Sequence, residues 1–511
     1  MIANSVWEEI KSGSDIRGVA SDIVKEEKVT LTNEVIEKIA LAFAVWISKK
    51  TNLEYSSITI SLGHDSRESA LRIKNVIINS LRGLGINVYD CSLTSTPAMF
   101  MATSVLSCTA SIEITASHHP ANRNGLKFFT ADGGLSEEDI SEILEIAQIE
   151  KEFSLNKRGS VRSIDLMQHY CEKLKSLIKE KINNQKNYER PLSGLKIVVD
   201  AGNGAGGFFV KDILTPLGAN TKGSKFLNPD GGFPNHIPNP EEPSAIKSIV
   251  DAVKENGADL GIIFDTDVDR VAFVDSTGKE ISGNKLIALA SKMVLEENPN
   301  SIIVTDSVTS DYLKDFIEKF GGTQFRYKRG YHNVITMAKT INAKGENCPL
   351  AIETSGHAAF KENKFIDDGA YFACKIIAQL VKLKEKNKNL NEYLKDFVSA
   401  KEKTSIKLPI KAEEGNINNV GVKILNSFRN YCSNNKNIIL EKDNIEGVRI
   451  TFKFKHQKGW MLLRKSVHDP VLILYAESYI PNSLRSMFKL INPFFTKQQS
   501  ELDISDMKKF F

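Results

Sequence analysis

Three aspartates stand at alternate positions directly after an apolar run, a pattern that could bind a cation. Asp265, Asp267 and Asp269 follow the apolar residues 262–264, and Arg270 comes next. Carboxylates this close repel one another, and a cation between them would remove that cost. Hard oxygen ligands favour Mg²⁺ or Ca²⁺, and Mg²⁺ usually keeps positions open for water or a phosphate oxygen. We therefore expect a magnesium site with Arg270 able to hold a second anion; a solvated acidic loop is the alternative.

A serine lies among histidines and a lysine in the segment 115–127. Ser117 is followed by His118 and His119, and Lys127 lies further along the same segment. Imidazoles and positive charge could activate this hydroxyl as a nucleophile. They could equally stabilise a phosphoryl group attached to it, which carries a charge of about −1.5 to −2. A polar turn is the third interpretation, and acyl transfer is disfavoured because no GxSxG elbow surrounds the serine.

Two later clusters have residue types suited to a phosphorylated sugar. Glu353, Ser355 and His357 offer a carboxylate, a hydroxyl and an imidazole within five residues, which suits vicinal hydroxyls. Arg464 and Ser466, followed by His468, form a cationic turn that resembles a phosphate pocket. An ordinary turn and a surface hairpin explain these two clusters about as well. The early turn containing Arg17 is uninformative by itself.

The elements expected to position these residues are short buried strands alternating with helices. Four apolar runs, rich in β-branched residues, stop at or just before an acidic residue, which suits central parallel strands covered on both faces. These runs are residues 58–62, 197–199, 262–264 and 302–305. Between two of them, Pro243 and an i, i+3, i+4, i+7 apolar stripe predict a helix that ends at Asn256-Gly257. Open α/β sheets bind ligands at the carboxyl ends of such strands.

The composition excludes several protein classes. Of 511 residues, 41% are hydrophobic and 25% are charged, with a net charge of +4, so collagen-like, disordered and nucleic-acid-gripping proteins are disfavoured. The longest apolar run, residues 39–47, is shorter than the about 20 residues of a membrane span and predicts a buried helix. No secretory signal begins the sequence, and six cysteines lack any CxxC pair. We expect a cytoplasmic, multidomain enzyme without nucleic-acid or membrane partners.

The texture of the sequence changes near residue 403. The lysine-rich stretch 382–403 predicts a solvated helix and a hinge, and residues 445–452 and 471–475 predict strands of a smaller α+β unit. The weakly patterned residues 151–162 predict a link before a helix that contains Tyr170 and Leu174. Residues 482–511 have no clear assignment.

Read in order, these motifs resemble the α-D-phosphohexomutase superfamily over essentially the whole chain. The matching segments are Arg17-Gly18, Gly-His-Asp-Ser-Arg at 63–67, Thr-Ala-Ser-His at 115–118, Asp-Gly-Gly-Phe-Pro-Asn-His at 230–236 with Pro-Asn-Pro-Glu at 238–241, the loop 265–270, and Glu-Thr-Ser-Gly-His at 353–357. Six motifs in the right order are more specific than any one of them. The sequence departs from the family at Thr266 and Val268 (commonly Gly), His119 (Asn), His332 (Lys) and in Ser-Val-His-Asp at 466–469 (Ser-Gly-Thr-Glu/Asp).

The resemblance implies a fold class and a domain order. We expect an α/β protein of three mixed-sheet α/β domains plus a C-terminal α+β domain around a central cleft. The expected domains are residues 1–163 with the phosphoserine loop, 164–280 with the metal loop, 281–402 with the sugar-specificity loop, and 403–511 with the phosphate-binding turn and the C-terminal tail.

The resemblance also implies the roles of individual residues. The catalytic set would be Ser117, His118, Lys127 and Arg17, and the metal set would be Ser117, Asp265, Asp267 and Asp269. The substrate-binding set would be Arg270, Gly330, His332, Glu353, Ser355, His357, Arg464, Ser466 and His468. One Mg²⁺ is the expected cofactor, with a hexose 1,6-bisphosphate as intermediate and activator.

The implied activity is an intramolecular phosphoryl transfer between the 1- and 6-positions of a hexose, glucose or mannose, in a monomer or homodimer that binds small sugar phosphates. Three alternatives stay open on the sequence. One is a phosphoglucosamine mutase. Another is a haloacid-dehalogenase-like phosphatase, although Asp269 stands where that family has Thr or Val. The third is a sugar-phosphate-binding regulator without catalysis.

Overall fold

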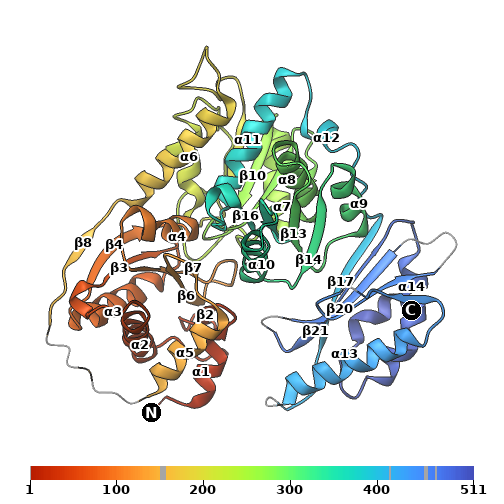
Figure 1. The fold of residues 1–511 in the computed structure, drawn as a ribbon, viewed down its shortest axis with the longest axis horizontal. Coiled ribbons are helices and arrows are strands. Elements are labelled where there is room, and N and C mark those ends of the chain that lie inside the picture. The colour runs from red at the N-terminus through yellow and green to blue at the C-terminus, as the bar shows by residue number, and fades with distance from the viewer. Residues whose placement is uncertain are drawn as a thin grey trace. The chain divides into compact units, whose positions relative to one another are not determined.

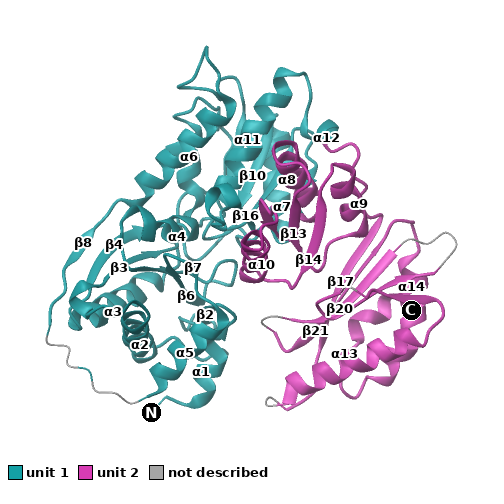
Figure 2. Ribbon diagram, in the orientation of Figure 1, with its two compact units in different colours: residues 1–282, 355–393 teal, residues 283–354, 394–511 magenta. Residues whose placement is uncertain are grey.

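The computed structural model describes residues 2–149, 153, 157–413, 416–442, 444–453, 459–466 and 469–510. They form two compact units (Figure 2). Unit 1 comprises Met1–Ser282 and Ser355–Tyr393, and unit 2 comprises Gly283–Thr354 and Leu394–Phe511. The chain therefore leaves unit 1, builds part of unit 2 and returns to unit 1 before completing unit 2.

The first sheet of unit 1 runs in the order β1-β2-β6-β5-β3-β4-β8, with β7 paired to β6. Its strands are β1 (Lys11–Ser12), β2 (Asp15–Val19), β3 (Thr59–His64), β4 (Asn87–Leu93), β5 (Ala110–Ile114), β6 (Arg123–Thr130), β7 (Gly133–Gly134) and β8 (Val161–Ser163). Strand β3 is parallel to β4 and β5, whereas β6 is antiparallel to β5 and β2. The sheet is therefore mixed. Because β5 and β6 are antiparallel neighbours, the chain turns back on itself within the segment 115–127.

Two sets of helices cover this sheet (Figure 1). One face packs on α1 (Asn4–Ile10), α2 (Asn33–Thr51), α3 (Ala70–Gly83) and α5 (Glu137–Gln148) in a single apolar core. Ile60 and Ile112 point into that core, so the alternate residue Ser111 faces the other side, where its hydroxyl donates to Met99 O on α4 (Thr96–Val105) at 2.6 Å. The predicted buried helix over 39–47 is confirmed as the apolar centre of α2.

The second sheet of unit 1 has the order β12-β11-β10-β9. Its strands are β9 (Ile197–Asp200), β10 (Leu260–Phe264), β11 (Val271–Asp275) and β12 (Glu280–Ile281). Helix α7 (Pro243–Asn256), which ends at the left-handed Gly257 as predicted, packs on one face. On the other face, Phe273 contacts Phe372 of α11 (Gly369–Glu385), and α6 (Leu166–Ile182) packs on α11. Strand β16 (Ala358–Phe360) also belongs to unit 1.

The predicted strands are confirmed as strands, but two of them are not central parallel strands, and the first of these is β10, which is antiparallel to its neighbour β11. All four runs form strands, and three of them lie between two neighbouring strands. Strand β9 is instead the last strand of its sheet, where only isolated bridges from residues 196 and 200 continue the pairing. All four residues of β9 are buried. Its sequence is therefore as apolar as that of a central strand, because hydrophobicity indicates burial and not hydrogen-bond pairing with neighbouring strands.

Unit 2 contains a parallel sheet and a C-terminal antiparallel sheet. In the parallel sheet, β13 (Ile302–Asp306) lies between β14 (Thr323–Tyr327) and β15 (Leu350–Ile352), accompanied by α8 (Gly283–Glu297), α9 (Asp311–Lys319) and α10 (Tyr331–Ala343). The C-terminal sheet has the order β17-β21-β20-β19-β18. Its strands are β17 (Glu402–Pro409), β18 (Ile438–Leu440), β19 (Val448–Phe452), β20 (Gly459–Lys465) and β21 (Val471–Ser478).

One face of the C-terminal sheet packs on α13 (Ile417–Ser433) and α14 (Leu484–Lys497). The tail that the sequence left unassigned thus completes the core of this sheet, because α14 and a short helical turn at Ser505–Phe510 both contribute buried side chains. Three sheets associated with helices and a C-terminal antiparallel sheet with helices on one face confirm the predicted fold class. The predicted domain boundaries stay a prediction.

Two local predictions differ from the structure. Residues 382–403 do not form one solvated helix: they contain the end of α11, the short α12 (Leu390–Tyr393) with Leu390 and Tyr393 buried, and the start of β17. Residues 161–162, expected in a link, pair with β4 as part of β8, whereas most of residues 150–156 lie outside the described residues. Across the described part of the chain, no helix combines the length and apolar character needed to cross a membrane.

Candidate active site

The acidic loop is a tight turn between two buried strands of unit 1. It joins β10 to β11, and Arg270 N donates to Asp265 Oδ1 at 3.2 Å, closing the turn. Val268 has φ +67° and is buried, a backbone conformation that is strained for a β-branched residue. Gly369 lies against this turn, because its N–H donates to Val268 O at 3.1 Å and a Cβ there would meet two loop carbonyls at 2.9 Å. The loop is held in one shape before any ligand binds.

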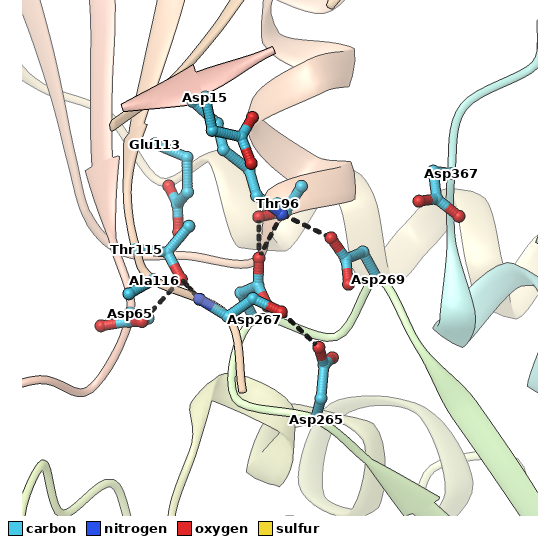
Figure 3. Close-up of polar contacts among 12 residues, drawn as sticks. Asp15, Asp65, Thr96, Glu113, Thr115, Ala116, Asp265, Asp267, Asp269 and Asp367 are labelled. Atoms are coloured by element: carbon cyan, nitrogen blue, oxygen red, sulfur yellow. Dashed lines mark hydrogen bonds and ion pairs between the residues drawn. The ribbon is translucent and has the colours of Figure 1, made fainter. Parts of the chain in front are cut away.

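The three loop carboxylates converge on one point (Figure 3). One oxygen from each of Asp265, Asp267 and Asp269 lies within 4.8 Å of the others, and all three side chains are buried. Among the described residues, no group donates a hydrogen bond to Oδ1 of Asp267 or of Asp269. Buried carboxylate oxygens without a donor are costly to the fold and are the ligands that a hard divalent cation requires. The arrangement therefore fits Mg²⁺.

Burial and the surrounding charges shift the pKa values of Asp265 and Asp269 in opposite directions. Burial raises the pKa of Asp265 well above its usual range, and the Asp269 and Asp267 carboxylates raise it further. Burial also acts to raise the pKa of Asp269, but neighbouring positive charge, chiefly that of Lys127, brings it below its usual value. The cluster thus holds mutually repelling carboxylates that a cation would stabilise.

Ser117 touches this acidic cluster. It follows β5 in a left-handed conformation (φ +51°), it is fully buried, and its Oγ donates to Asp265 Oδ2 at 2.9 Å. His118 Nδ1 lies 3.3 Å from the same Oγ. Burial, with the positive charge of Arg270, lowers the pKa of His118 well below its usual range. The imidazole is therefore neutral at physiological pH and, because the serine proton goes to Asp265, its Nδ1–H can donate to the serine oxygen.

Arg67 binds the backbone of the serine loop. Its two terminal nitrogens donate to the carbonyl oxygens of four loop residues, at distances between 2.5 and 2.8 Å; the four are Ser117, His119, Pro120 and Arg123. Its Nε binds Asp65 Oδ2 at 3.1 Å, and that carboxylate also accepts from Thr115 Oγ1 at 2.7 Å. Phe233 lies over the guanidinium at 5.1 Å. These buried, fully bonded groups determine where the serine points.

Lys127 and Thr96 connect the serine segment to the acidic loop. Lys127 Nζ lies 2.8 Å from Asp267 Oδ2 and 2.5 Å from Asp269 Oδ2, with its side chain buried. Thr96, at the start of α4, donates to Asp267 twice: its N–H to the backbone oxygen at 2.9 Å and its hydroxyl to Oδ2 at 2.5 Å. The N-terminus of a helix favours a negative charge at this position. Arg17 donates to Asp15 Oδ2 at 2.8 Å and to Ala116 O at 3.4 Å, beside the serine.

A histidine orients Arg270 in unit 1. Arg270 Nε donates to His357 Nε2 at 2.8 Å, and His357 Nδ1 lies 2.5 Å from Asp367 Oδ2. Because Nε2 accepts from the arginine, the ring proton lies on Nδ1 and points to Asp367. Ser355 is buried in the same unit. The sequence prediction of a shared role for 353–357 thus spans a unit boundary, because Glu353 belongs to unit 2.

In unit 2, Glu353 lies beside the turn that begins α10. Gly330 N donates to Glu353 Oε1 at 2.6 Å, and His332 stands in the first turn of that helix, half-buried. Asp306, at the end of β13, is buried nearby, where burial and the Glu353 charge raise its pKa to about 7. The predicted residues 330, 332 and 353 therefore come together at the carboxyl ends of the parallel strands.

The predicted phosphate turn follows β20 in unit 2. Arg464 is buried, and its guanidinium donates to Lys465 O at 2.7 Å and to the Tyr475 hydroxyl at 3.2 Å. Ser466 is half-buried and accepts at its Oγ from Asp469 N at 3.1 Å. His468, with Val467, lies outside the described residues.

Sequence reasoning missed several residues that build the site. Asp65 and Arg67 entered only as a motif, although Arg67 shapes the serine loop. Thr96, Asp367 and the glycine-rich segment 204–207 were not linked to the site. Gly204 approaches the acidic loop so closely that a Cβ would meet Thr266 O at 2.6 Å. A Pro directly after a Ser-Thr pair at 95–97 was the available signal for the helix start at Thr96; the others depend on contacts between distant segments.

Comparison with known proteins places this site in a family. Successive segments match the α/β/α domains of phosphoglucomutase/phosphomannomutase: domain I over residues 9–154, domain II over 168–278 and domain III over 282–400. Phosphomannomutase/phosphoglucomutase of Pseudomonas syringae pv. tomato is 30% identical over 96% of each chain. The protein belongs to the phosphoglucomutase/phosphomannomutase family.

Other members of the family are similar over comparable lengths. Phosphomannomutase of Escherichia coli K12 is 30% identical, with 91% of this chain and 93% of the relative covered. A crystal structure of a phosphoglucomutase/phosphomannomutase family protein from Burkholderia thailandensis has a TM-score of 0.78 at 24% identity, with 98% of each chain covered, and supports the fold. As a phosphoglucomutase/phosphomannomutase family member, the protein is an enzyme of the mutase type, and the phosphatase and regulator alternatives are not favoured.

Proposed function

We propose that the protein interconverts hexose 1-phosphate and hexose 6-phosphate, with glucose or mannose as the hexose, through a phosphoserine at position 117. The 2.9 Å contact between Ser117 Oγ and Asp265 Oδ2 carries this proposal. Among the described residues of the serine loop, only Ser117 directs its hydroxyl at the acidic cluster. The contact therefore links this serine to three carboxylates that could bind a cation in the same unit. A phosphoryl group on this oxygen would lie among Arg17, Lys127 and the acidic loop.

Asp265, Asp267 and Asp269, together with an oxygen on Ser117, would hold one Mg²⁺. A magnesium ion supplies charge neutralisation for a transferring phosphoryl group. The unbonded Oδ1 atoms of Asp267 and Asp269 support this ligand set. Lys127, already bonded to both carboxylates, keeps their other oxygens oriented.

The first half of the reaction transfers the phosphoryl group from phosphoserine to a free hydroxyl of the sugar monophosphate. The bond between phosphorus and Ser117 Oγ breaks as a bond to the sugar oxygen forms, and the hydroxyl proton leaves toward a neighbouring base. Arg17 and Lys127 offset the charge on the equatorial oxygens, because phosphoryl transfer mainly requires positioning and charge neutralisation. Neutral His118 orients the serine oxygen.

The second half returns the other phosphate of the hexose 1,6-bisphosphate to Ser117. The sugar must therefore bind in two orientations, with the phosphate that is not reacting held elsewhere. We assign its hydroxyls to Glu353 and Ser355, with Gly330 and His332 beside them. Arg270, oriented by His357, and the turn with Arg464, Ser466 and His468 bind phosphate. Free bisphosphate would act as the activator, because it regenerates phosphoserine.

We also propose a cytoplasmic location and a monomer or homodimer that binds small sugar phosphates. Six buried cysteines, with no disulfide among the described residues, support a reducing compartment.

The test is a direct assay of purified protein with glucose 1-phosphate, mannose 1-phosphate and glucosamine 1-phosphate, following the 6-phosphates with and without chelator. We expect magnesium-dependent turnover of glucose or mannose substrate and an acid-stable phosphate on the peptide containing Ser117. Ser117→Ala should abolish turnover, whereas Ser104→Ala, at an exposed position on α4, should not. Turnover retained in Ser117→Ala would overturn the proposal, and an acid-labile phosphate would indicate an aspartyl phosphatase instead.

A further inference from the structure

We propose that Arg329 is a second phosphate-binding guanidinium in unit 2, which binds the non-reacting phosphate of the sugar together with Arg464. This inference rests on the proposed function and adds a residue to it. It follows from the way the loop before α10 meets the C-terminal sheet within unit 2.

Both guanidiniums converge on one hydroxyl. Arg329 Nη1 donates to the Tyr475 hydroxyl at 3.2 Å, and Arg464 Nη2 donates to the same oxygen at 3.2 Å. A tyrosine oxygen can accept both donors, but it brings no negative charge to them. Two positive groups that share a neutral acceptor repel each other, and an anion placed between them would be stabilised.

The Glu446 carboxylate contacts both residues of this pair. Glu446 Oε2 accepts from Arg329 N at 3.1 Å and from the Ser307 hydroxyl. Its Oε1 lies 3.6 Å from Arg464 Nη1, beyond hydrogen-bond distance. Glu446 therefore fixes the backbone of Arg329 beside Arg464, where one phosphate could reach both guanidiniums.

Arg464 retains an unsatisfied donor in this cluster. Its side chain is 3% exposed, and its buried Nε finds no hydrogen-bond acceptor among the described residues. Leaving a buried charged donor unpaired is costly, and an arriving phosphate oxygen would remove that cost. This donor is an observation independent of the shared Tyr475 hydroxyl.

Arg329 is better placed than Arg464 to meet a ligand from solvent. It is half-buried on the loop before α10, whereas Arg464 is buried. The next residue, Gly330, has φ +120° and donates its N–H to Glu353 Oε1. One peptide bond thus separates the proposed phosphate contact from the carboxylate proposed to bind the sugar hydroxyls. Arg329 would therefore set the distance between the two recognised groups of the substrate.

The test compares Arg329→Met with Arg485→Met, a matched loss of an exposed arginine on α14 in the same unit. In the full chain, we expect Arg329→Met to raise KM for glucose 1-phosphate or mannose 1-phosphate at least about tenfold with kcat changed less than about threefold. Arg329→Lys should recover only part of the loss, because an ammonium lacks the planar fork. Binding of glucose 6-phosphate, measured by calorimetry, should weaken in parallel. Unchanged KM and binding in Arg329→Met would overturn the inference.

Tyr475→Phe provides a second variant that keeps the aromatic ring. Removing only the hydroxyl should free both guanidiniums from their shared acceptor and alter KM, with kcat and the melting temperature preserved; an unchanged KM would contradict a shared site. The two proposals fail differently. If the wild-type protein binds glucose 6-phosphate through Arg329 but shows no turnover, the mutase function fails and the binding site stands. If turnover is present and Arg329→Met behaves like wild type, the function stands and this inference fails.

Discussion

The serine and aspartate cluster of unit 1 and the arginine cluster of unit 2 handle charge in opposite ways. In unit 1, the reacting groups are buried and bonded to one another, since Ser117 donates to Asp265 and Lys127 donates to Asp267. In unit 2, the half-buried Arg329 before α10 and the buried Arg464 on β20 share the neutral hydroxyl of Tyr475. A transferring phosphoryl group needs a fixed environment that excludes water, whereas a site that must accept either end of a sugar needs unsatisfied donors.

Each unit also has one buried arginine that organises its loops. Arg67 binds four carbonyl oxygens of the serine loop, and Arg449 binds Ser307 O and Thr309 O in the loop after β13. Arg449 also stacks on Trp460 at 3.9 Å and binds Asp311 at 2.8 Å. Both arginines shape the loops that carry function, but only Arg67 shapes the reacting one.

The largest expected effect comes from the acidic loop. Asp267→Asn keeps the size of the side chain but removes the charge that meets Lys127 and Thr96, so kcat should fall by roughly 10²–10³-fold. The measurement is turnover across a range of Mg²⁺ concentrations, with Asp251→Asn on the exposed face of α7 as the control. Wild-type magnesium dependence in Asp267→Asn would remove this residue from the metal site.

The two organising arginines allow the comparison to be tested directly. Arg67→Met leaves the Asp65 carboxylate buried without its partner, so the free energy of unfolding should fall by about 3–5 kcal/mol. Arg449→Met should also destabilise, measured by urea unfolding. Only Arg67→Met should lower kcat in the remaining folded protein, whereas Arg449→Met should chiefly raise KM. An equal loss of kcat in both variants would show that catalysis and substrate binding are not separated between unit 1 and unit 2.

A smaller effect is expected at the phosphate turn. Arg464→Ala should raise KM for the phosphorylated sugar roughly tenfold while kcat stays within about threefold, because it removes a charge-assisted contact that persists through the reaction. Arg485→Ala is the control. An unchanged KM would place the phosphate away from this turn.

The smallest effect concerns a buried carboxyl beneath the site. Glu113, on β5, accepts from Thr94 Oγ1 at 2.7 Å, and burial raises its pKa well above its usual range. Between the usual pKa and this raised value, the unfolded chain has lost the proton while the folded chain retains it, so stability falls as pH rises, by at most about 1.4 kcal/mol per pH unit. Glu113→Gln should remove this slope and be more stable than wild type at pH 8, with equal stability at pH 4. If the free energy of unfolding, measured in urea, changed with pH equally in both proteins, this account would be contradicted.

The sequence predicted those parts of the molecule that depend on local pattern. Apolar runs located β3, β9, β10 and β13, and the Pro and Gly signals located α7, because each element carries its own burial pattern. The aspartates at alternate positions predicted a cation site, since their repulsion is visible without a structure. Pattern failed at 382–403, where lysines suggested a solvated helix although Leu390 and Tyr393 are buried.

The rest of the site depends on contacts between distant segments. Arg67 reaches residues 117–123, and Thr96 reaches Asp267, across separations that no periodicity reports. Asp367 acquires its role only because the chain returns to unit 1 after residue 354. Glu113 interrupts an apolar stretch of the sequence, and its surroundings cannot be inferred without knowing which face of the sheet it occupies.

The packing of the last helices gives the distal end of the chain a mechanical importance. Phe510 stacks on Phe488 at 4.2 Å, and Leu502 bridges to Ile410 next to β17. Deletion of residues 505–510 would therefore remove apolar side chains that pack against the sheet containing Arg464. Such a loss would first weaken substrate affinity and cause the protein to aggregate, while phosphoryl transfer at Ser117 could persist in the same molecule.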